Sequence, residues 1–219
     1  MSDNKAWNWS ANKSEIWEIP SEESYYLVER WKRKNYDIFL DLGCGLGRHS
    51  IQFAKNGFST FSYDLSPEGI THLRERAKVE HCLVRASVGD MATLPYDNSF
   101  FDCLLAYHVI SHTDTNGIIK VVSKMERVLK PGGEVFLSLC SKKAWSYKDA
   151  GFPVIDENTV EKVEDGPENG IPHFFADREI IDKLFTGFEI DTLRHTQDLI
   201  VKGKDYGSWH YFILGIKKK

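Results

Sequence analysis

The sequence predicts an α/β fold, a doubly wound and mostly parallel sheet with helices on both faces and a C-terminal antiparallel strand. Short apolar runs of strand-like composition alternate with amphipathic runs of helical period along most of the 219 residues. The turns between them are short, which favours parallel strands joined by crossover helices. The last two strand-like runs, 188–194 and 209–216, have no helix between them, so we expect these two to pair antiparallel.

The elements are expected in a regular order after a polar N-terminal segment. Residues 1–35 carry four tryptophans and a helix over 22–34, which we expect to form an N-terminal helical cap. The predicted strands then cover 37–42, 58–63, 82–88, 101–109 and 134–140, and the predicted helices cover 47–56, 67–80, 116–129 and 178–185. Ser66-Pro67-Glu68 supplies a helix N-cap, a proline at the first helical position and an early acid.

Residues 142–176 form a long connection with no predicted helix. Plain connectors are shorter, so we expect an insertion that covers the substrate, built as a hairpin within 159–175. A surface excursion without a function is the alternative. With this insertion and the N-terminal cap included, residues 1–219 are expected to form a single domain.

The charge and the cysteines exclude several classes of protein. Lys and Arg total 28 and Asp and Glu total 32, a formal net charge of -4, which argues against a protein that binds nucleic acid through phosphate contacts. The four cysteines are scattered without a Cys-x-x-Cys pair, which predicts reduced thiols rather than disulfides or a zinc site, and we expect no bound metal. There is no signal-peptide core and no apolar run near the ~20 residues that span a membrane. We therefore expect a cytoplasmic protein without a membrane partner.

The predicted carboxyl ends of the strands carry residues suited to a bound ligand, and in open α/β sheets ligands bind outside these ends. Strand one ends in Asp41-Leu42-Gly43-Cys44-Gly45-Leu46-Gly47, strand two in Asp64, strand three in Asp90-Met91 and strand four in Tyr107-His108. The glycines let the backbone turn sharply and approach a ligand. Asp64 is placed to accept hydrogen bonds from two ribose hydroxyls, and Asp90 to accept one from an adenine amine, with Met91 against the ring.

Two nucleoside cofactors suit such a loop. The dinucleotide fingerprint needs a third glycine at position 48, where this chain has Arg48. The acid Asp41 would repel a pyrophosphate, but it suits the ammonium group of an amino-acid tail. These charges favour S-adenosylmethionine over NAD. Arg48 is expected either to reach the carboxylate of that tail or to lie on the surface.

Four segments carry a family resemblance: DLGCGLGRHS, FSYDLSPEGI, VGDMATLPYDNSFFDCLLAYHVISH and RVLKPGGEVFLSL, which follow one another within residues 36–140. In this order and spacing they resemble the successive motifs of class I S-adenosylmethionine-dependent methyltransferases, most closely the branch that acts on small molecules. The resemblance implies a Rossmann-like sheet and S-adenosylmethionine as the cofactor. The chain lacks the Asn/Asp-Pro-Pro-Tyr/Phe segment that amino-methylating DNA enzymes carry after strand four, so the resemblance implies no nucleic-acid base as the acceptor.

The resemblance also implies cofactor-binding roles for nine residues. They are Asp41, Gly43 and Gly45 at the methionine part, Asp64 and Leu65 at the ribose and adenine, Asp90 and Met91 at the adenine, and Ala106 and Tyr107 on the sulfonium side.

Three histidines are candidate catalytic residues. A nucleophile with an acidic proton needs a general base, for which histidine is the usual side chain. His108 and His112 flank the exit of strand four, and His173 lies in the insertion. A role in packing or hydrogen bonding is the alternative for each of them.

The sequence therefore predicts an enzyme that moves a methyl group from S-adenosylmethionine to a small-molecule acceptor by in-line displacement. A protein or RNA methyltransferase, and a non-catalytic protein that binds S-adenosylmethionine, stay open as alternatives.

Overall fold

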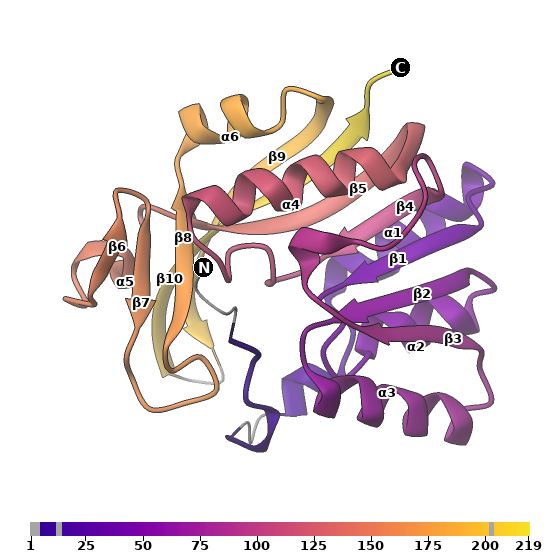
Figure 1. Cartoon of the computed structure of the whole chain (residues 1–219), viewed down its shortest axis with the longest axis horizontal. Helices are drawn as coiled ribbons and strands as arrows, with labels where there is room; N and C mark the ends of the chain where they lie inside the picture. Colours follow the sequence, from indigo (N-terminus) through magenta and orange to yellow (C-terminus); the bar gives the residue numbers. More distant parts are fainter. Residues whose placement is uncertain (1–4, 12–14, 202–203) are drawn as a thin grey trace.

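The computed structural model describes residues 5–11, 15–201 and 204–219. The five predicted parallel strands are present as β1 (Ile38–Leu42), β2 (Ser59–Asp64), β3 (Val84–Val88), β4 (Phe101–Ala106) and β5 (Leu129–Ser141). They pair in the order β3-β2-β1-β4-β5, so the strand order reverses between β1 and β4 (Figure 1). This reversal puts the expected ligand-binding edge at the carboxyl ends of β1 and β4.

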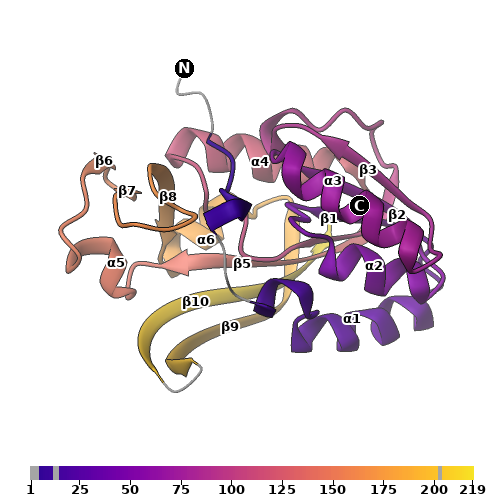
Figure 2. The ribbon, with the colours of Figure 1, turned by 90° about the horizontal axis from the view of Figure 1, so that it is seen from below.

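Helices cover both faces of the sheet, which confirms the predicted Rossmann-like α/β class. On one face lie α1 (Glu22–Arg33), α2 (Arg48–Lys55) and α3 (Pro67–Val79), and on the other lie α4 (Thr115–Val128) and α6 (Arg178–Leu184) (Figures 1 and 2). Capping side chains mark where they begin. Ser66 Oγ accepts a hydrogen bond from Gly69 N, and Asp114 accepts one from Gly117 N.

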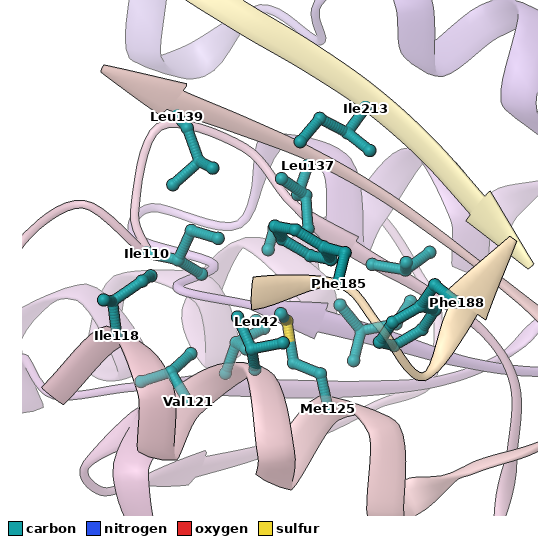
Figure 3. Packing of buried hydrophobic residues seen from close by; sticks show 14 of the residues in the cluster. Leu42, Ile110, Ile118, Val121, Met125, Leu137, Leu139, Phe185, Phe188 and Ile213 are labelled. Carbon is teal, nitrogen blue, oxygen red and sulfur yellow. The ribbon is translucent and has the colours of Figure 1, made fainter. Parts of the chain in front are cut away.

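The alternation of side chains along β1 divides the core in two. Leu40 and Leu42 join a fully buried cluster under α4, to which Met125 also belongs (Figure 3). Phe39 points to the opposite face, where its ring stacks on Phe53 of α2 with the centroids 3.9 Å apart. Burying each such side chain stabilises the fold by about 1.5–3 kcal/mol. Asp41, between Leu40 and Leu42, therefore points toward α2 and not toward α4.

The buried carboxylate of Glu134 connects α1 to the sheet through hydrogen bonds. The side chain of Glu134 on β5 is fully buried. It accepts hydrogen bonds from Arg30 Nε and Nη2 and from Trp31 Nε1, each 2.8 Å long, and it pairs with Lys34 Nζ. Burial raises the pKa of the Glu134 carboxyl, but these three partners outweigh it and hold the pKa below its usual range.

The C-terminal hairpin is longer than predicted. β9 (Phe188–Val201) and β10 (Lys204–Lys217) pair antiparallel, and β10 also pairs antiparallel with β5. The pairing confirms the predicted topology, but each strand extends into the polar segment between the two apolar runs. The exposed residues Thr196, Gln197 and Asp198 of β9 are held by the backbone ladder with β10, so their polar pattern did not predict a strand. Figure 2 shows the hairpin curving away from the rest of the sheet.

The long connection after β5 folds into α5 (Trp145–Lys148), β6 (Val154–Asp156), β7 (Thr159–Lys162) and β8 (Ile171–Ala176). The expected hairpin is β7–β8, whose strands pair antiparallel. The single turn α5 was not predicted. β8 also pairs parallel with the end of β5 through Cys140 and Ser141, and Phe174 N donates to Ser111 O. The connection therefore joins the main sheet at its ligand-binding edge.

Strand β4 ends three residues earlier than its apolar run predicted, at Ala106 rather than Val109. The chain leaves the sheet because His108 adopts a left-handed conformation, with φ 52°. Its backbone N–H donates to Ser138 Oγ over 2.7 Å. The shorter β4 leaves room beside the end of β5, and β8 fills it.

Candidate active site

The loop between β1 and α2 depends on its glycines. Gly43 and Gly45 have φ angles of +69° and +52°, in the left-handed region that side chains disfavour. A Cβ on Gly43 would lie 2.1 Å from a methyl carbon of Val109, and one on Gly45 would lie 2.5 Å from the ring of Trp9. The loop is thus covered closely by the residues that follow β4 and by the N-terminal segment.

Asp64 connects the end of β2 to this loop. Its Oδ2 accepts a hydrogen bond from Gly45 N and its Oδ1 accepts one from Ser66 N, both 2.8 Å long. Burial raises the pKa of the Asp64 carboxyl, and the two backbone N–H groups oppose that rise. Each oxygen keeps a second lone pair for a ligand.

Asp41 lies behind the loop. Its carboxyl is buried, and Oδ2 accepts a hydrogen bond of 2.5 Å from Ser50 Oγ, which in turn accepts one from Ser62. Burial raises the pKa of Asp41 to about 7, although the Ser50 hydroxyl opposes the shift. Asp41 therefore joins β1 to α2 from inside the protein.

Two cavities lie at the carboxyl ends of the strands, with volumes of about 490 Å³ and 510 Å³ including their open mouths. The first cavity is lined by Gly45, Arg48, Tyr107 and His108 among others, and the second by Leu65, Asp90 and Met91 among others. Both are lined by Trp7, Gly43, Asp64, Val109 and His112, so the cavities are two halves of one cleft.

The cleft gathers most of the predicted cofactor residues. Seven of the nine line it, namely Gly43, Gly45, Asp64, Leu65, Asp90, Met91 and Tyr107. Asp41 and Ala106 line neither half, and Ala106 is fully buried in the core. Asp90 also caps a short turn, since its Oδ1 accepts a hydrogen bond from Ala92 N.

The N-terminal segment covers the first cavity with three tryptophans. The rings of Trp7, Trp9 and Trp17 lie against one another, with centroids 5.3–6.1 Å apart. Arg48 holds this segment: its Nη1 donates to Ile16 O over 2.8 Å, and its guanidinium lies 4.9 Å from the Trp17 ring. The expectation that Arg48 lies on the surface is wrong, because its charge is used inside the protein to anchor the segment.

The three candidate histidines differ in their surroundings. His108 is half-buried beside Ser138 and His210 in the wall of the first cavity, and desolvation holds its pKa well below the usual range. His112 is partly exposed in the cleft, and its ring lies 5.7 Å from that of Trp7. His173 lines neither cavity and is only 2% exposed, directly behind His112.

Glu168 is a part of this site that the sequence did not reveal. Its Oε1 lies 3.4 Å from His112 Nε2 and 3.4 Å from His173 Nε2, and its Oε2 pairs with Lys162 Nζ. Burial raises the pKa of Glu168, but the two histidines and Lys162 outweigh it and hold the pKa far below its ordinary value. Glu168 stands in an acidic turn between β7 and β8 that resembles a solvated loop, and the fold alone brings it to His112.

The reversal of strand order, the glycine loop and the carboxylates at the ends of β2 and β3 define a doubly wound α/β protein that binds a nucleoside cofactor. Within the part of the chain that the structure describes, no helix is long and apolar enough to cross a membrane.

Comparisons with known proteins point to one family. Residues 39–133 match the family model described as a methyltransferase domain. Phosphoethanolamine N-methyltransferase 1 of Zea mays is 33% identical over 120 residues, which are 54% of this chain and 23% of the relative. Malonyl-[acyl-carrier protein] O-methyltransferase of Salmonella typhimurium is 31% identical over 123 residues, 53% of this chain and 47% of the relative. The chain thus spans less than half the length of either relative.

Solved structures share the fold. A SAM-dependent methyltransferase from Methanosarcina mazei superposes with a TM-score of 0.72 at 22% identity, covering 85% of this chain and 97% of the other. Magnesium protoporphyrin IX methyltransferase from Synechocystis, solved with bound SAM, gives a TM-score of 0.64 at 15% identity over 90% of this chain and 79% of the other. The domain match over residues 39–133, the relatives and the shared fold together support a class I S-adenosylmethionine-dependent methyltransferase with S-adenosylmethionine as its cofactor. The resemblance found in the sequence is confirmed.

Proposed function

We propose that this chain transfers the methyl group of S-adenosylmethionine to a small-molecule acceptor by in-line displacement. The observation that carries the proposal is the divided cleft, whose two halves meet at Gly43, Asp64, Val109 and His112. A cofactor with a nucleoside at one end and an amino acid at the other fits such a cleft, with its reactive centre at the junction.

The second cavity suits the adenosine. Asp64 has lone pairs for the ribose hydroxyls, Leu65 and Met91 supply apolar surface for the adenine, and Asp90 lies beside them. The first cavity suits the methionine part, with Gly43, Gly45 and Tyr107 in its wall. In this proposal Asp41 and Ala106 act from behind the wall, Asp41 by positioning α2 through Ser50.

The indole N–H groups also fit a polar ligand. Nε1 of Trp7 and Nε1 of Trp9 are buried, and neither has a hydrogen-bond partner among the described residues. Buried donors of this kind are rarely left unpaired in native proteins. Both rings lie over the cleft, so the carboxylate and the hydroxyls of the cofactor are suitable acceptors.

Two segments restrict what reaches the methyl group. We propose that the N-terminal segment with Trp7, Trp9 and Trp17 forms a cap over the cofactor, and that residues 142–176 cover the acceptor, both within a single domain of residues 1–219. A cleft covered by the N-terminal segment favours a small acceptor over a protein or RNA. The relatives whose names state small acceptors, among them norajmaline N-methyltransferase of Rauvolfia serpentina, support the same proposal.

When bound, S-adenosylmethionine supplies an already activated methyl group. The residues of this chain then have to align the acceptor and exclude water. His112 is the partly exposed imidazole at the junction of the cavities, and Glu168 lies beside it to stabilise a positive charge on the ring. His112 is therefore the candidate base, while His108 lines the first cavity and buried His173 lies behind His112.

The proposal is tested in two steps. Calorimetric titration with S-adenosylmethionine, S-adenosylhomocysteine and NAD is expected to show binding of the first two only. Methyl-labelled S-adenosylmethionine is then offered with small amines, alcohols, thiols and carboxylates, and with total protein and RNA as competing acceptors. Label found in a small molecule supports the proposal, whereas label confined to protein or RNA contradicts it.

A further inference from the structure

Three potential metal ligands meet beside the cleft, from three different parts of the chain. His112 follows β4, Glu168 stands in the turn between β7 and β8, and His173 lies on β8. One ligand atom from each, two imidazole nitrogens and a carboxylate oxygen, lies within 4.8 Å of the other two.

The hydrogen bonding of His173 leaves a lone pair directed into this cluster. Its Nδ1 lies 2.9 Å from Ile171 O, and a carbonyl oxygen only accepts, so Nδ1 carries the proton and Nε2 carries the lone pair. Nε2 is buried and has no hydrogen-bond partner among the described residues. The atom it faces, Glu168 Oε1, is also an acceptor.

Two facing acceptors need a positive species between them. A proton on His173 Nε2 would place a charge on a ring that is only 2% exposed. A metal ion meets the same need without protonating the ring. Lys162 pairs with the other oxygen of Glu168, which fixes the carboxylate and leaves Oε1 for the cluster.

The spacing of the atoms suits a first-row transition metal. In tetrahedral zinc sites with bonds of about 2.0–2.1 Å, neighbouring ligand atoms lie about 3.3 Å apart. Glu168 Oε1 lies 3.4 Å from each of the two Nε2 atoms. His112 is the partly exposed ligand, so a rotation of its ring adjusts the remaining distance, between His112 Nε2 and His173 Nε2.

We propose that His112 Nε2, His173 Nε2 and Glu168 Oε1 bind one divalent transition-metal ion of the zinc type. Two imidazoles and one carboxylate favour such an ion over magnesium or calcium, which prefer oxygen ligands throughout. Three protein ligands leave a coordination position open, and one of the three, His112, lines both cavities. Resting on the proposed function, the open position is where the oxygen, sulfur or nitrogen atom of the acceptor would bind. As a metal ligand His112 would not act as the base, and the bound ion would instead favour loss of the acceptor's proton.

The proposal is tested by metal binding itself. Full-length protein is stripped with a chelator and titrated with Co²⁺, whose visible absorption reports coordination, and with Zn²⁺ in a calorimeter. We expect one ion per chain with a micromolar or tighter Kd. His112→Ala and Glu168→Gln are each expected to weaken metal binding by more than about 100-fold. Replacing a residue that only contacts a metal ligand weakens binding by about 10- to 100-fold.

A matched control is available in His72. Its Nε2 lies 3.4 Å from Glu18 Oε1, the same histidine–glutamate separation, but at a surface pair that is not part of any three-ligand group among the described residues. His72→Ala is expected to leave metal affinity unchanged. Circular dichroism and S-adenosylmethionine titration of every variant separate a lost ligand from a lost fold.

The outcomes distinguish this proposal from the proposed function. Wild-type protein that binds neither ion at millimolar concentration overturns the metal site, as does equal binding by wild type, His112→Ala and Glu168→Gln. Metal binding without any methyl transfer contradicts the proposed function and leaves the site standing.

Discussion

At the scale of single residues, the cleft is built from carboxylates that already have backbone partners. Asp64 accepts hydrogen bonds from Gly45 N and Ser66 N, so it shapes the glycine loop and the start of α3 at the same time. A ligand that uses its remaining lone pairs therefore binds to a side chain fixed in advance, which lowers the entropic cost of binding.

Asp64→Ala should weaken S-adenosylmethionine binding. The substitution removes the acceptor for two buried N–H groups and for the ribose, and we expect a loss of about 2 kcal/mol or more in binding free energy, which is about 30-fold in Kd. Calorimetry measures it. Asp97→Ala, at an exposed position, serves as the control and should bind like wild type. An unchanged Kd for Asp64→Ala would remove this residue from the site.

The buried Asp41 makes stability depend on pH. Its pKa is about 7 in the folded protein against 3.8 for an unperturbed carboxyl. Between these values the folded chain holds a proton that the unfolded chain releases, so this group's contribution to stability is complete below the lower value and is lost as the pH rises toward 7.

Asp41→Asn removes this contribution while keeping an acceptor for Ser50. Denaturant unfolding without cofactor, at pH 5 and at pH 8, is expected to show a smaller loss of stability between the two pH values in Asp41→Asn than in wild type. An identical loss in both proteins would show that Asp41 does not titrate in this range.

At the scale of elements, α1 depends on one carboxylate of β5. Glu134→Ala leaves the partly buried Arg30 and the buried Trp31 N–H without their acceptor. Breaking a buried pair in this way costs about 3–5 kcal/mol. Urea unfolding measures the loss, and Glu179→Ala, which breaks an exposed pair with Lys183, should change stability little. Similar stabilities for the two variants would contradict the role given to Glu134.

The N-terminal segment should control exchange of the cofactor. Trp9 lies directly over Gly45, where its ring occupies the space that a Cβ would need. Trp9→Ala is expected to raise the dissociation rate of S-adenosylhomocysteine severalfold by opening the cleft, as stopped-flow fluorescence can measure. Trp145→Ala, in the half-exposed α5, is the control. Equal dissociation rates in both variants would argue that the segment does not cover the cofactor.

In the whole molecule, the features that the sequence predicts are those set by residues close together in the chain. The parallel strands, their helices and the residues at the carboxyl ends of β1 to β4 follow from periodicity, caps and a glycine loop. Glu168 does not, because it is 56 residues from His112 and only the pairing of β8 with β5 brings them together. Arg48 does not either, since its partners Ile16 and Ile19 precede it by about thirty residues in a segment without a strong pattern.

β9 is a long edge strand of the sheet. Among the described strands, β9 pairs with β10 alone, so one side of its backbone is open along 14 residues. Exposed margins of this length recruit strands from other molecules unless charges prevent it. β9 carries exposed charged side chains at intervals along its length, at Glu189, Asp191, Arg194 and Asp198. These charges therefore oppose the pairing of β9 with a strand of another molecule. Replacing them by threonine or valine would make β9 a nucleus for self-assembly.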